Sequence, residues 1–209
     1  MSIVKLNNRG VRSATTFGSI SNLGSMILIK KITASSSATI SFVHGTSDVV
    51  LDNTYKEYIF TLNNMHPENG GGSPMMTAST NSGSSYGVTA TTTDFRSTHS
   101  ESGGSTGVVY RTATDLTEST DEVNIFGGTG TGNENDECCV GIVHLFNPSS
   151  TTFVKHFMAR THGYADDDRA YSNFSAGYFN TTSAINAIRF INGSSNDMDA
   201  GDICLYGIN

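Results

Sequence analysis

The chain has 209 residues, of which 36% are hydrophobic and only 15% are charged, and its formal net charge is −7. Nucleic-acid binding is not expected, because proteins hold a phosphate backbone by neutralising it with Lys and Arg side chains. Membrane insertion is not expected either, because no apolar run reaches the roughly 20 residues that a transmembrane helix needs. The residues after Met1 lack the apolar region of a signal peptide, so we expect synthesis in the cytoplasm.

Three segments in the first part of the chain have the alternation of β-strands. Residues 25–32 form an apolar run, and residues 38–44 place Ile40 and Phe42 on one side and hydroxyl side chains on the other. Residues 55–62 are rich in Tyr, Ile and Phe, which suit a pleated surface better than a helix. Each segment is therefore predicted to be a strand.

Two stretches are dominated by Gly, Ser, Thr and Asn, which are typical of turns and loops. They cover residues 63–108 and 127–137. Apolar anchors such as Tyr86, Val88 and Phe95 are sparse in the first of them. We predict a long polar loop at each stretch.

A β-hairpin is predicted around Pro148. Apolar segments at residues 140–146 and 152–158 flank Asn147–Ser150, where the proline presets the backbone for a turn. The sequence leaves open whether the loop has about four or five residues, and this choice decides which side chains share a face. The remaining predicted strands lie nearer the C-terminus, at residues 175–179, 184–191 and 202–208.

Together these segments predict an all-β fold with roughly eight to ten strands, as in an antiparallel β-sandwich of the jelly-roll type. The length suits a single domain that spans residues 1–209. Cys138 and Cys139 are adjacent, so on a strand they would point to opposite faces, and a bond between them would be strained. Cys204 then has no evident partner, and we expect all three thiols to be reduced.

Several segments carry a resemblance to known proteins, and they include the strings ITASSSATISFV, HLFNPSSTTFVKHF and GDICLYGI. The segments are residues 23–43, 55–60, 144–157, 176–185 and 201–208. They resemble the predicted structural proteins of marine tailed bacteriophages, such as those of phages that infect cyanobacteria. The resemblance implies a virion component and brings no catalytic residues with it.

We therefore expect a non-enzymatic structural protein on the outer surface of a phage particle, made in the host cytoplasm. A head decoration or knob is favoured, because the chain has no collagen-like repeat or heptad stem from which a long fibre is built. Viral jelly rolls often associate into closed rings, so we expect a homotrimer that contacts other virion proteins.

Two alternatives remain open at this point. A tail-fibre or tail-tip module that binds a host surface glycan would use tyrosine rings. The candidates for these rings are Tyr86, Tyr110, Tyr164, Tyr171 and Tyr178. A glycan hydrolase would need two carboxyl groups held about 5 to 9 Å apart, and the sequence alone does not show such a separation.

Carboxylates and histidines supply the candidate metal ligands. Calcium prefers oxygen ligands, and the foremost candidates are Asp166, Asp167 and Asp168. Further acidic groups are Glu134, Asp136 and Glu137, and Asp197, Asp199 and Asp202. The sequence contains no calcium-loop consensus, so solvated acidic loops are the plainer interpretation.

His144 and His156 lie on adjacent predicted strands and would approach one another in one hairpin register, although packed strand histidines are again the plainer interpretation. No other cofactor is expected.

Overall fold

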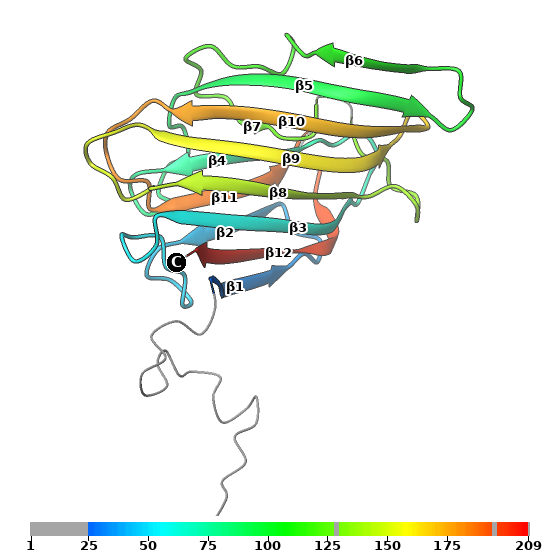
Figure 1. Cartoon of the computed structure of the whole chain (residues 1–209). Helices are drawn as coiled ribbons and strands as arrows, with labels where there is room; N and C mark the ends of the chain where they lie inside the picture. The colour runs from blue at the N-terminus through cyan, green and yellow to red at the C-terminus, as the bar shows by residue number, and fades with distance from the viewer. Residues whose placement is uncertain (1–24, 128–129, 194–195, 209) are drawn as a thin grey trace, which may run out of the picture.

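The computed structural model describes residues 25–127, 130–193 and 196–208 (Figure 1). The segment after Met1 that bears on a signal peptide lies outside these ranges. Within them the chain forms twelve strands and no helix, so the predicted all-β fold is confirmed and the predicted number of strands was too low. No helix of the described residues therefore has the length and apolar character needed to cross a membrane.

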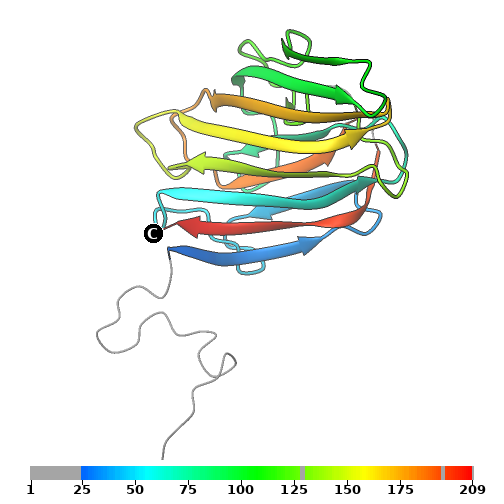
Figure 2. The same ribbon diagram turned by 45° about the vertical axis from the view of Figure 1, so that its right-hand side comes forward.

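Two antiparallel sheets pack face to face as a β-sandwich (Figures 1 and 2). The large sheet contains, in spatial order, β1 (Met26–Thr33), β12 (Met198–Ile208), β3 (Glu57–Pro67), β8 (Cys139–Phe146), β9 (Lys155–Ala165), β10 (Arg169–Phe179), β5 (Ala90–Ser100) and β6 (Thr106–Tyr110). The small sheet contains β2 (Thr39–Val43), β11 (Ala187–Asn192), β4 (Pro74–Ser79) and β7 (Val123–Asn124).

The strand order follows the jelly-roll pattern with two additions. When β5, β6, β9 and β10 are set aside, the order is β1-β12-β3-β8 in the large sheet and β2-β11-β4-β7 in the small one. These strands cross between the two sheets along the chain, as in a jelly roll. The hairpins β5–β6 and β9–β10 lie together at one side and widen the large sheet (Figure 1).

An aromatic cluster holds the two sheets together beneath β3. Phe60 of β3 meets Phe42 of β2 and Phe190 of β11 edge to face, with ring centroids 5.3 and 5.2 Å apart. Ile40 is also buried, which confirms the alternation predicted for residues 38–44. Such packing contributes through apolar burial and through the preferred geometry of the rings.

The prediction for residues 63–108 was wrong. That stretch contains the end of β3, all of β4 and β5 and the start of β6. Apart from Ala90, the buried positions of β5 are polar, with Asp94 and Arg96 facing inward, so its strand pattern is not that of an apolar core. In the described part of residues 127–137, by contrast, no strand forms.

The predicted hairpin exists, but its connection is longer than expected. Ser150 N–H donates to the carbonyl of Asn147 at 3.0 Å, which confirms the turn. The chain does not pair at once, because the N–H groups of Thr152 and Phe153 bind Ser150 Oγ at 3.2 and 3.1 Å. Consequently β9 begins only at Lys155.

Candidate functional site

The outer face of the large sheet, the side turned away from the small sheet, carries exposed apolar and aromatic side chains. Along β9 buried and exposed residues alternate without a break, and the outward positions include Met158 and Arg160. Met158 is 57% exposed, and Ile142 on the adjacent β8 is 43% exposed. A strand buried on one face normally presents polar residues on the other, so this face differs from an ordinary solvated one.

One ladder of side chains crosses the outer face on five neighbouring strands. Tyr110 lies opposite Phe95, Phe95 opposite Phe174, Phe174 opposite Arg160, and Arg160 opposite Ile142. The rings of Phe95 and Phe174 stack with centroids 5.0 Å apart and an interplanar angle of 6°. The Arg160 guanidinium lies 5.0 Å from the Phe174 ring centroid, which is within cation–π range.

A groove of about 490 Å³ runs beside this ladder, and we call it the aromatic groove. Its outward side chains are Thr93, Phe95, Ile142, His144, Met158, Arg160, Phe174 and Ala176. Its volume is within the range of about 300–1,000 Å³ typical of ligand pockets, and aromatic residues, Met and Arg are the types enriched where proteins meet.

Charge is sparse around the aromatic groove. His144 Nδ1 lies 2.5 Å from Glu57 Oε1 on the neighbouring β3, so Glu57 is held at the groove's margin. Among the described residues that line the groove, Arg160 is the one side chain with a permanent charge. A surface of this kind favours apolar and stacking contacts over the recognition of a strongly charged ligand.

The inner face beneath this ladder is polar. Asp94 accepts hydrogen bonds from Thr114 Oγ1 and, at 3.3 Å, from Ser175 Oγ. Arg96 donates to the carbonyl of Gly127 at 3.0 Å and lies 3.9 Å from the Tyr171 ring centroid. The Asp94 contact fixes the segment after β6 to the underside of the sheet, and the Arg96 contact fixes the residues after β7.

Burial changes the titration of both charged groups in this interior. It raises the pKa of the Asp94 carboxyl above its ordinary value of 3.8, against the opposing effect of its hydroxyl donors. It likewise lowers the pKa of the Arg96 guanidinium below its ordinary value. Because both side chains are enclosed and serve internal contacts, we assign them a structural role.

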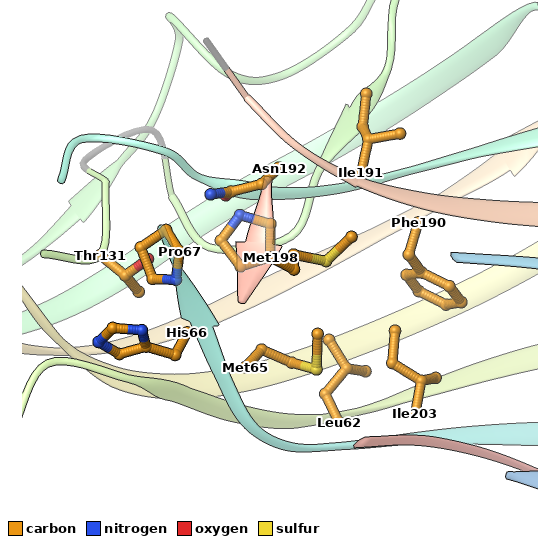
Figure 3. Close-up of a pocket in the computed structure, with 11 residues that line it drawn as sticks. Leu62, Met65, His66, Pro67, Thr131, Phe190, Ile191, Asn192, Met198 and Ile203 are labelled. Carbon is orange, nitrogen blue, oxygen red and sulfur yellow. The ribbon is translucent and has the colours of Figure 1, made fainter. Parts of the chain in front are cut away.

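A small cavity between the sheets cannot hold a cofactor or substrate. Its volume is about 10 Å³, the lower limit for one water molecule. Figure 3 shows its lining, with Asn192, Thr131, Pro67 and Met198 toward one end and Leu62, Phe190 and Ile203 toward the other. Both amide atoms of Asn192 are buried without a hydrogen-bond partner among the described residues.

The predicted calcium ligands lie in the turn between β9 and β10. Asp167 Oδ2 accepts hydrogen bonds from Tyr171 Oη at 2.7 Å and from Arg169 at 3.3 Å, so it is used to close the hairpin. Asp168 has a positive φ of 59°, and Asp166 is exposed. In the ranges that the structure covers, no three His, Cys, Asp or Glu side chains are grouped to hold a metal ion.

The other acidic candidates also have internal partners. Glu137 accepts from Glu134 N–H at 2.8 Å in the loop before β8. Asp136 in the same loop and Asp197 before β12 belong to no group of three potential metal ligands among the described residues. Asp199 lies 2.7 Å from His66, and Asp202 lies 2.6 Å from Lys31. These carboxylates are therefore divided among separate contacts.

The two histidines of the predicted pair contact different residues in the structure. His144 lies opposite Met158 and binds Glu57, whereas His156 packs against Tyr178 with ring centroids 5.8 Å apart. The three cysteines are free, with Cys139 and Cys204 buried and Cys138 partly buried. The high pKa of Cys139, about 12, follows from its burial.

Only some of the tyrosines proposed for glycan contact lie on the outer face. Tyr110 and Tyr178 do, and Tyr164 is on the same side of β9. Tyr171 is buried beneath Arg96, and the Tyr86 ring is covered by Arg189, whose guanidinium is 4.3 Å from the ring centroid. The sequence interpretation missed Phe174 and Met158, which the alternation along their strands would have placed on a common face once the sheet order was known.

Comparisons with protein-family models, with curated proteins and with solved structures find no significant match to this chain.

Proposed function

We propose that this chain is a non-enzymatic structural protein on the outer surface of a phage particle, where the outer face of the large sheet attaches it to neighbouring virion proteins. Head decoration is the station that we favour. The observation that carries the proposal is the exposed ladder from Tyr110 to Ile142, because contiguous exposed apolar patches mark interaction sites.

The dimensions of the face support this role. With strands about 4.8 Å apart and a rise of about 3.4 Å per residue, the large sheet measures about 34 Å across and about 30 Å along its strands. That area is on the order of 1,000 Å², and a standard protein interface buries about 800 Å² on each partner. The sequence resemblance to phage structural proteins supplies the kind of particle, and the homotrimer expected from it remains a prediction.

The location is tested by labelling purified particles. An antibody raised against the chain is applied to intact tailed phages of the kind that encode it, and the particles are imaged by electron microscopy. We expect label distributed over the head. Label confined to the tail tip would favour the receptor-binding alternative, and the absence of label from particles would contradict a virion role.

The role of the face is tested by co-sedimentation of variants with heads stripped of this protein. Phe95→Ala and Met158→Ala remove exposed contacts, so we expect each to weaken attachment. Ser97→Ala lies on the outer face but outside the aromatic groove and serves as the matched control. Equal attachment of all three variants would contradict the proposed surface.

A glycan-binding module is the second candidate, because the aromatic groove has the volume of a ligand pocket and a wall of rings. A glycan array separates the two candidates. Binding that Phe174→Ala abolishes would favour recognition of a host glycan, whereas a structural attachment role predicts no glycan signal. Hydrolysis is not proposed, because the groove holds no pair of carboxylates among its lining residues.

A further inference from the structure

The free edge of β6 has an unusual composition for an exposed strand. All five residues of Thr106–Tyr110 are exposed, and none of them is charged. Val108 is 75% exposed and Val109 is 46% exposed. Because an exposed edge offers unpaired backbone groups to other chains, proteins usually protect it with charged side chains, Pro or bulges, and β6 has none of these.

The opposite edge of the large sheet shows what protection looks like. β1 carries Lys30 and Lys31, and its register with β12 shifts between Leu28 and Lys30. Lys31 is further fixed by Asp202 at 2.6 Å. One sheet therefore has one edge with two lysines and a bulge and one edge with neither, and Figure 1 shows β6 lying along the outside of the sheet.

The hydrogen-bond pattern identifies which groups of β6 face outward. Arg111 N–H donates to Asp94 O, and Ser100 N–H donates to Ser105 O. Antiparallel pairs alternate between bonded and non-bonded, so Val109 and Gly107 bond to β5 as well. The N–H and C=O groups of Thr106, Val108 and Tyr110 then point away from the sheet.

We propose that β6 pairs antiparallel with β6 of a second copy of this chain, about a two-fold axis at Val108. In this register Val108 faces Val108 of the other copy, and Thr106 faces Tyr110 in both directions. Every outward N–H and C=O of the three residues gains a partner, and the contact is isologous, as two-fold interfaces are. No charged side chain meets its own copy, since the strand has none.

This pairing would also join the two outer faces. Tyr110 and Val108 point to the same side as Phe95 and Ser97, which lie opposite them on β5. Rotation about an axis normal to the sheet keeps that side outward in both copies, so the two aromatic grooves would lie on one continuous surface. The inference is independent of the proposed function, because it follows from the strand edge alone.

Cross-linking tests the register. Bonded antiparallel residues have Cα atoms about 5.5 Å apart, within the range of about 4.4–6.8 Å that disulfides span. Under mild oxidation, we expect Val108→Cys to give a covalent dimer on non-reducing gels. Tyr110→Cys, which would face Thr106, is the matched control and is expected to give none, as is the unmodified chain with its native thiols.

Solution mass tests the contact without cross-linking. Val108→Lys places like charges opposite each other on the axis, so we expect it to halve the mass of the assembly in light scattering across a dilution series. Leu28→Lys adds the same charge at the β1 edge and is expected to leave the mass unchanged. A monomeric wild-type chain, a failure of Val108→Cys to link, or an equal effect of Leu28→Lys would overturn the proposal. If Val108→Lys fails to fold by circular dichroism, the cross-link alone decides.

Discussion

β3 and β5 belong to the same sheet, and their inner faces are opposite in chemistry. β3 buries Tyr58, Phe60 and Leu62, whereas the corresponding alternation on β5 buries Asp94 and Arg96. Over these residues both strands keep the two-residue period of a sheet with one face enclosed. On both strands the fold decides which side chains are buried. The strands differ in the contacts that hold the layer beneath them, which are apolar under β3 and polar under β5.

The difference follows from what covers each strand. Beneath β3 the cover consists of rings from the small sheet, which need only apolar contact. Beneath β9, β10 and β5 it includes β7 and the residues after it, whose carbonyls require donors when buried. Thr161 donates a hydrogen bond to the carbonyl of Ile125 at 2.5 Å, and Ser175 donates to that of Asn124 at 3.2 Å. Arg96 donates to the carbonyl of Gly127 at 3.0 Å.

Removal of a ring beneath β3 is expected to have the largest effect. Phe60 is 1% exposed and contacts rings of both neighbouring strands of the small sheet. Phe60→Ala should lower the free energy of unfolding by about 3–5 kcal/mol through lost burial and the cavity left behind. Equilibrium denaturation with urea measures the change.

Phe95→Ala is the matched control on β5, because the same ring is 44% exposed there. An exposed substitution is expected to change the free energy of unfolding by less than about 1 kcal/mol. A loss as large as that of Phe60→Ala would mean that the outer ladder is part of the folding core and would remove the contrast between the two strands.

Asp94→Ala should have an intermediate effect. It removes the carboxylate that accepts from Thr114 and Ser175 and leaves these hydroxyls only the carbonyls of Arg111 and Asn124, at 3.3 and 3.2 Å. Hydrogen bonds to a charged group contribute about 1.5–3 kcal/mol, so we expect a loss of that order. Because the affected contacts hold the segment after β6, we also expect faster proteolysis within residues 111–121 of the variant. Unchanged stability and unchanged cleavage would show that the polar contacts under β5 are dispensable.

The pH profile of Asp94→Asn isolates the charge. Burial raises the pKa of Asp94 in the fold above 3.8, so the folded state retains a proton that the unfolded chain loses. The stability that this group contributes is present below pH 3.8 and is lost as the pH rises through the folded pKa. Wild type should therefore lose stability relative to Asp94→Asn over that interval, and a relative gain would contradict the assignment.

The same contrast explains what the sequence could predict. Segments whose buried side is apolar, such as those around Ile40 and Phe60, were identified because side-chain chemistry and burial coincide there. β5 was predicted as loop because its Phe95 faces outward and its Asp94 inward, which no single-strand pattern distinguishes from a polar loop. A polar interior becomes visible only when the partner that it bonds, here the main chain of residues 124–127, is known.

The candidate site depended on long-range register in the same way. His144 was singled out from the sequence for a pairing with His156, yet its partner is Glu57, far away in the chain. The ladder from Tyr110 to Ile142 combines residues from five strands whose spatial order differs from their chain order. The choice of which outward residues become neighbours is a property of the topology, and the alternation within each strand leaves it open.

The smallest expected effect on stability comes from the far end of β3. There the strand that buries the aromatic cluster also makes a polar contact, between His66 and Asp199. His66 Nδ1 lies 2.7 Å from Asp199 Oδ1, and His66 Nε2 lies 3.2 Å from Glu134 O. Burial lowers the pKa of His66, but the hydrogen bonds outweigh it and leave the pKa above 6.5. The contact thus stabilises the fold below pH 6.5 and weakens as the pH rises through the folded pKa.

Asp199→Asn removes the charge that favours the imidazolium and keeps the shape of the side chain. Because Asp199 is 39% exposed, solvent screens the pair, and the expected loss at low pH is on the order of 0.5 kcal/mol. The difference in unfolding free energy between wild type and Asp199→Asn should shrink as the pH rises above 6.5, whereas the Asp94 difference should change from pH 3.8 upward. If both differences in unfolding free energy changed over the same pH interval, the two ends of the large sheet would titrate as a single unit. The division between a half packed by aromatic rings and a half held by hydrogen bonds would then not hold.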